Sequence, residues 1–214
     1  MATLLATLPK HDQTTRCISA WAKKALDEAR KKGFTVFELA DKRACRREFE
    51  SMVKKHKPAF VFLNGHGNAV AVGGNENKVL VQAGENENIL KDTVTYALSC
   101  QSAKVLGEES VKAGARAYIG YKEDFIFLFD EEKRTRPEDD KLAGLFLEPS
   151  NQIAVSLIKG RTAHDSHLNG KKYFARNMQK MLTSQTSKAD TTTLRYLYWN
   201  MSNLACHGDG NATV

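Results

Sequence analysis

The sequence lacks any apolar run long enough to cross a membrane, although the chain has 214 residues. Residues 4–8 are apolar, but this run is too short for a secretory signal and has no basic flank. The absence of both signals predicts a cytoplasmic protein with no membrane partner.

Cysteine is scarce, and the sequence has no C-x-x-C pair and no internal repeat. The four cysteines are far apart in the chain, at Cys17, Cys45, Cys100 and Cys206. This spacing argues against a disulfide framework and against a cysteine-rich zinc site. We therefore expect free thiols in a reducing compartment and no bound metal.

Positive charge is confined to one part of the chain. The formal net charge is +7, and residues 1–57 hold 14 Lys and Arg against 7 Asp and Glu. Few aromatic residues lie among these charges, which fall on the outer faces of two expected helices. A solvated helix surface is the preferred interpretation, and no nucleic acid partner is expected.

Strand-like and helix-like segments alternate along the first 129 residues. Apolar strands are expected at residues 3–8, 34–39, 59–63, 94–99 and 115–120. The expected helices include one capped by Thr14 or Thr15, one capped by Asp41, and one over residues 102–113. Two apolar runs joined by a Gly/Asn-rich turn predict a β-hairpin flap over residues 69–82.

This alternation predicts a three-layer α/β fold with a mostly parallel sheet and helices on both faces. We expect one domain over residues 1–214, comprising a sheet core (1–129), an exposed charged loop (130–141) and a helical part (142–214). In the last part, helical pieces at 142–147 and 153–158 are separated by Pro149. Further helices are expected at 163–182 and 193–201, and residues 204–214 carry little signal.

Two expected strands stop at residues that can carry out chemistry. The strand at 94–99 is followed by Cys100 and then by a helix-like segment, whose N-terminus would favour a thiolate. The strand at 59–63 is followed by Asn64, Gly65, His66 and Gly67. Adjacent parallel strands end at one edge of a sheet, so these residues predict a Cys100/His66 dyad in one cleft.

Each residue alone has a simpler explanation. A cysteine at a strand end is often a buried small apolar residue, and a histidine in a turn often bonds to its own loop. His164 and His167, three residues apart on an expected helix, could bind a metal with Asp165, but a third placed ligand is missing and a solvated helix face is preferred.

Together, these motifs resemble the caspase-like cysteine peptidases, which include caspases, metacaspases, separases, gingipains, clostripain and CHAT domains. The similarity rests on two stretches, Phe-Val-Phe-Leu-Asn-Gly-His66-Gly67 and Tyr-Ala-Leu-Ser-Cys100-Gln-Ser, with the hairpin between them. It runs in order over residues 1–129. The caspase sequence Gln-Ala-Cys-x-Gly is absent, as is an obvious recruitment prodomain, so a separate regulatory partner is expected.

The resemblance implies a three-layer caspase-like fold and a role for each motif residue. Cys100 would be the nucleophile, His66 would move the protons, and the backbone N–H groups of Gly67 and Cys100 would form an oxyanion hole. Asp12 falls where relatives that cut after basic residues carry an acid.

The position of Glu123 and Asp124 after the fifth strand offers two further carboxylates for an S1 pocket. With Asp12, they predict cleavage after Arg or Lys.

We therefore expect a cysteine endopeptidase that acts on polypeptides and needs no cofactor. Two alternatives remain open. The first is a catalytically silent caspase-like module that binds a partner peptide, against which the intact Cys100 and His66 argue. The second is a cysteine hydrolase or amidotransferase for small molecules, which would have a closed pocket instead of a groove.

Overall fold

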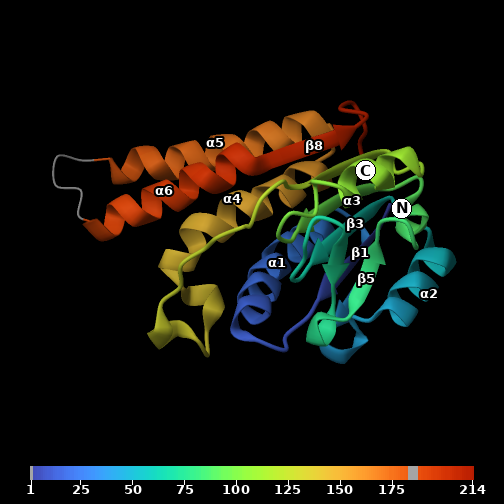
Figure 1. Ribbon diagram of the computed structural model, residues 1–214, viewed down its shortest axis with the longest axis horizontal. Coiled ribbons are helices and arrows are strands. Elements are labelled where there is room, and N and C mark those ends of the chain that lie inside the picture. The colour runs from blue at the N-terminus through green and yellow to red at the C-terminus, as the bar shows by residue number, and fades with distance from the viewer. Residues whose placement is uncertain (1, 183–187) are drawn as a thin grey trace.

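The computed structural model describes residues 2–182 and 188–214 (Figure 1). Its centre is a six-stranded sheet in the order β2-β1-β3-β6-β7-β8. The first five strands are parallel and β8 is antiparallel to β7, which confirms the mostly parallel sheet. The strands are β1 (Thr3–Leu8), β2 (Thr35–Ala40), β3 (Phe60–Asn64), β6 (Val94–Leu98), β7 (Ala117–Tyr121) and β8 (Leu204–Gly208).

Helices cover both faces of this sheet, as predicted. Helices α1 (Gln13–Lys31) and α4 (Lys141–Ile158) lie on one face, and α2 (Arg46–His56) and α3 (Leu106–Lys112) lie on the other. Successive side chains of a strand point to opposite faces of the sheet, so each strand contributes residues to both helical layers. In β3, for example, Phe60 and Phe62 join the α1/α4 core, whereas Val61 and Leu63 join the α2/α3 core.

Two long helices lie beyond α4, the first packed against α4, β7 and β8 and the second packed against the first (Figure 1). Helices α5 (Ala163–Met181) and α6 (Lys188–Asn203) contribute Phe174 and Leu197 to a buried cluster with Phe146 of α4. None of the helices, over the residues described, is long and apolar enough to span a membrane.

Helix α4 is continuous, so the expected interruption at Pro149 is wrong. A proline inside a helix provides no N–H for the carbonyl four residues earlier, here that of Leu145. The side chain of Asn177 on α5 replaces this donor, with its Nδ2 2.8 Å from the Leu145 oxygen. Tertiary packing therefore stabilises a helix that the local sequence would break.

Three other local expectations need correction. Asp12 caps α1 instead of Thr14 or Thr15. Asp41 lies in a 3₁₀ turn with a φ of 53°, and α2 begins after Cys45. Strand β8 was not expected, because it is a short edge strand in which Leu204 is the one fully buried residue.

The flap is present as β4 (Ala71–Gly73) paired antiparallel with β5 (Val79–Gln82). The charged segment 130–141 is mostly exposed, as predicted, but contains two 3₁₀ turns, Glu131–Lys133 and Pro137–Asp139. Trp21 of α1 fixes the second turn through a 2.7 Å hydrogen bond to the Pro137 carbonyl.

Candidate active site

His66 and Cys100 follow neighbouring parallel strands by the same number of residues. β3 ends at Asn64 and β6 at Leu98, and these two residues are register partners. Each candidate therefore lies two positions beyond a paired strand end, at the carboxyl edge of the sheet. The two side chains line one hollow of about 20 Å³. Its other lining residues are Thr14, Ile18, Gly65, Leu98, Ser99, Phe125 and Phe127.

Cys100 lies in a turn, so its expected place at a helix N-terminus is wrong. Turns occupy the chain after β6, and α3 does not begin until Leu106. Burial raises the pKa of the Cys100 thiol, and the negative charge of Asp124 adds to this effect. The thiol lies 3.9 Å from the Phe125 carbonyl oxygen. The resting group is therefore a thiol, and it needs a base to become a nucleophile.

His66 is half-buried and is held by Asp12. Its Nε2 lies 2.6 Å from Asp12 Oδ2, and its side chain is 36% exposed. A carboxylate at this distance fixes the orientation of the imidazole. With Nε2 engaged, Nδ1 is the imidazole nitrogen that remains for proton exchange.

Asp12 caps helix α1 and contacts His66 at the same time. Its Oδ1 accepts the Thr15 backbone N–H at 2.7 Å, which caps α1, while Oδ2 contacts His66. Burial raises the pKa of Asp12, but the hydrogen bonds from Thr15 and His66 outweigh burial and bring the pKa below its ordinary value. The sequence interpretation did not assign this contact to Asp12. A cap position directly after the first strand is the signal that could have suggested it.

Gly67 lies against the turn that carries Cys100. A Cβ on this residue would lie 2.1 Å from Ser99 Oγ and 3.0 Å from the Cys100 carbonyl oxygen. Any side chain would therefore push the two loops apart. A second hollow of about 200 Å³ extends from this glycine beneath the flap, between His66 and Val79.

The three predicted S1 carboxylates do not form one cluster of free acids. Asp12 is engaged by Thr15 and His66, and Glu123 pairs with Lys104 at 3.1 Å. Asp124 is exposed and accepts a 2.9 Å hydrogen bond from the side chain of Gln101, the residue after the nucleophile candidate. Of the three, Asp124 is the one whose charge acts on the Cys100 thiol.

Helix α6 supports the wall of the hollow. Asn200 is fully buried and bonds to both backbone groups of Ile126, at 3.0 Å to its N–H and 2.6 Å to its carbonyl oxygen. Trp199 donates to the Asp124 carbonyl at 2.9 Å. These bonds fix the segment that presents Phe125 and Phe127 to Cys100. Nothing in the sequence indicated this contribution, because the residues are about 75 positions apart.

His11 adds a third potential metal ligand beside the pair. Its Nε2 lies 3.5 Å from Asp12 Oδ2 and 3.1 Å from Asn77 Oδ1 of the flap turn. Ligand atoms of His11, Asp12 and His66 all lie within 4.8 Å of one another. A divalent cation at this position would compete with the Asp12–His66 hydrogen bond.

No protein-family model matches the sequence, and no curated protein sequence matches it either. Solved structures of similar fold do exist. The crystal structure of the Arg-specific cysteine proteinase gingipain R (RgpB) matches with a TM-score of 0.59 at 13% identity. A complex of the Porphyromonas gingivalis RgpB pro- and mature domains matches with a TM-score of 0.61 at 11% identity. Both matches cover 100% of this chain, which spans about half of those chains, 47% and 48% respectively.

Proposed function

We propose that this chain, which has the three-layer caspase-like fold, is a cysteine endopeptidase in which Cys100 and His66 act as the catalytic dyad. The observation that carries the proposal is their equivalent position, two residues beyond the paired ends of β3 and β6. A nucleophile and a base that share one hollow are the minimum arrangement for acyl transfer.

The proposed reaction begins with a neutral thiol. His66 Nδ1 removes the thiol proton as Cys100 attacks the scissile carbonyl, and the Asp12 carboxylate stabilises the imidazolium that results. The imidazolium then protonates the leaving amine, which leaves an acyl-enzyme. His66 next activates a water molecule, which hydrolyses the thioester and restores the thiol.

We assign the oxyanion hole to the backbone N–H groups of Gly67 and Cys100. Two N–H donors fixed in a site with little water stabilise the negative charge that develops on the carbonyl oxygen. The close approach between Gly67 and the Cys100 turn supports this pairing.

Arg or Lys is the proposed residue at P1. Asp124 supports this choice, because its charge acts on the thiol and its side chain is exposed beside Gln101. The similar gingipain R is described as Arg-specific. Asp12 and Glu123 were also predicted to serve this pocket, but their existing contacts make Asp124 the stronger candidate. One carboxylate paired with a guanidinium would favour a basic P1 residue by roughly ten- to a hundredfold.

Entry of a substrate side chain requires the aromatic residues that line the hollow to move. A hollow of about 20 Å³ holds little more than one water molecule, so Phe125 and Phe127 must shift before a side chain can enter. A regulatory protein that stabilises the open position is consistent with this need, and one of the similar structures is a complex of pro- and mature domains. The four cysteines are free thiols, as a cytoplasmic, reducing location would require.

The test is a panel of fluorogenic peptides with Arg, Lys, Asp or Asn at P1. We expect cleavage of the Arg and Lys peptides by the wild type and none by Cys100→Ala. Cys206→Ala is the matched control, because Cys206 is a half-buried free thiol outside the hollow. Binding of peptides without cleavage of any of them would favour the silent interaction module. Faster cleavage after Asp would reject the basic S1 pocket but not the dyad.

A further inference from the structure

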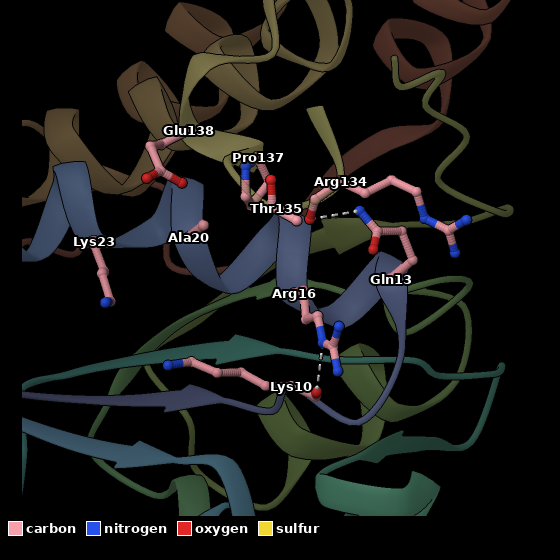
Figure 2. Close-up of a pocket in the computed structure, with 9 residues that line it drawn as sticks. All are labelled: Lys10, Gln13, Arg16, Ala20, Lys23, Arg134, Thr135, Pro137 and Glu138. Carbon is pink, nitrogen blue, oxygen red and sulfur yellow. Dashed lines mark hydrogen bonds between the residues drawn. The ribbon is translucent and has the colours of Figure 1, made fainter. Parts of the chain in front are cut away.

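A separate basic hollow lies on another face of α1. It has a volume of about 710 Å³ and is formed between this helix, the end of β1 and the charged segment 130–141 (Figure 2). The helix residues that line it are Gln13, Arg16, Ala20 and Lys23. Their spacing of three, four and three residues places them on one helical face, different from the face of Thr14 and Ile18 that lines the catalytic hollow.

The lining is strongly basic. Four cationic side chains, Lys10, Arg16, Lys23 and Arg134, surround the space, whereas Glu138 is the one carboxylate that lines it among the described residues. Lys10, Arg16 and Lys23 have no described carboxylate within ion-pair distance, and the Arg16 side chain bonds to the Lys10 carbonyl instead. Like charges gathered without counter-ions repel one another, and a bound anion would relieve that repulsion.

The contacts that attach segment 130–141 to α1 do not use these charges. Gln13 donates to the Arg134 carbonyl at 3.5 Å, and Trp21 donates to the Pro137 carbonyl at 2.7 Å. Figure 2 shows that Gln13 contacts the backbone carbonyl of Arg134 and not its guanidinium. Backbone acceptors therefore fix the segment and leave Lys10, Arg16 and Lys23 available to a ligand. Arg134 pairs with Glu131 of its own segment at 3.1 Å, and because both side chains are exposed, a multiply charged anion could replace this carboxylate.

We propose that this basic hollow binds a small molecule carrying two or more phosphate groups. Its volume falls in the range of small-molecule sites, about 300–1,000 Å³. The described lining contains no aromatic ring, so charge recognises the ligand and base stacking does not. An anion held by Arg16 and Lys23 on one side and by Arg134 on the other would tie segment 130–141 to α1. This site is separate from the proposed peptidase chemistry.

The experiment uses Cys100→Ala protein, so that binding is measured without self-cleavage and independently of peptidase activity. Calorimetric titration with inorganic tripolyphosphate, at matched ionic strength, should show one saturable site. The double variant Arg16→Gln/Lys23→Gln should bind at least roughly tenfold more weakly, because each removed cation eliminates charge-assisted hydrogen bonds. Lys31→Gln, at an exposed position near the end of the same helix, is the matched control and should bind like the parent protein.

A second readout tests the bridge to Arg134. Limited trypsin digestion followed by mass spectrometry should show slower cleavage after Lys133 and Arg134 when tripolyphosphate is present, and the double variant should lose this protection. Absence of saturable binding, equal weakening in Lys31→Gln, or unchanged trypsin cleavage would overturn the proposal. Binding of ATP more than tenfold tighter than tripolyphosphate would also overturn recognition by charge alone.

Discussion

The first three turns of α1 separate two hollows of opposite character. Thr14 and Ile18 face the narrow hollow of about 20 Å³ that His66 and Cys100 also line, together with two aromatic residues. Arg16 and Lys23 line the basic hollow of about 710 Å³ on another face. The narrow site suits a reaction that must exclude water, and the wide site suits an ion that must be attracted. One helix thus supports both, because its period of 3.6 residues presents different residues to each.

The sharpest way to test this separation is to remove the dyad. Cys100→Ala and His66→Ala should each lower kcat/KM for peptide cleavage by at least about a thousandfold, because the two groups act as one unit. Both variants should keep the wild-type melting temperature and tripolyphosphate affinity. Turnover near that of the wild type in Cys100→Ala would disprove the mechanism, and loss of anion binding would show that the two hollows are coupled.

Asp12 caps α1 and contacts His66, so its variants separate helix capping from the proposed catalysis. Asp12→Asn should keep a cap on α1 but lose the charge beside His66. We expect kcat to fall by about ten- to a hundredfold with little change in melting temperature. Asp12→Ala should lose the cap as well, at a cost of about 1 kcal/mol.

Thr162→Ala is the matched capping control, because Thr162 caps α5 away from the cleft. It should lose similar stability and keep full activity. Equal activity in Asp12→Asn and the wild type would show that the His66 contact is not used in catalysis. The folded pKa of Asp12 lies below its ordinary value of 3.8. Its stabilising contribution is therefore complete at neutral pH and declines as pH falls through the folded pKa.

A variant that loosens the segment carrying Phe125 and Phe127 should lower activity by a smaller factor. Asn200→Ala removes both bonds to Ile126 and leaves backbone groups without partners, at a cost of about 1–3 kcal/mol. We expect a roughly fivefold to tenfold loss of kcat/KM, measured by peptide cleavage at a temperature where the variant stays folded. Asn203→Ala removes only a bond to Trp199 one turn earlier and should behave like the wild type. Unchanged activity in Asn200→Ala would mean that α6 does not position the wall.

The smallest predicted effect concerns the pH dependence of the Cys100 thiol. Its pKa is raised by burial and by Asp124, so the reactive thiolate forms only as pH rises into the alkaline range. Alkylation by iodoacetamide should therefore accelerate steadily above pH 7, and Asp124→Asn should move this rise to lower pH. A rate that is already constant between pH 5 and 7 would instead indicate a thiolate paired with protonated His66.

The sequence predicted well which strands carry His66 and Cys100 at one edge of the sheet, because that edge depends on local signals. Apolar runs identified β3 and β6, and parallel pairing of neighbouring strands brings residues just beyond their ends together. The hairpin flap followed from two apolar runs joined by a turn. The helix expected over residues 102–113 is present as α3, but its predicted start was wrong because residues 102–105 form turns before it begins.

The contacts that the sequence analysis did not predict all join residues that are distant in the sequence. Asn177 satisfies the carbonyl that Pro149 leaves without a donor, and Asn200 holds Ile126 from 74 positions away. Asp12 meets His66 across 54 positions. Periodicity and propensity describe how a segment folds by itself, so they cannot identify such contacts.

The central claim is that Cys100 and His66 form one catalytic unit, and covalent labelling tests it most directly. Wild-type protein is treated with a peptidyl electrophile that carries Arg at P1, and the modified residue is identified by mass spectrometry. The account predicts modification of Cys100 in preference to Cys17, Cys45 and Cys206, with the rate falling sharply in His66→Ala. Labelling of another cysteine, or labelling of Cys100 at the same rate without His66, would contradict it.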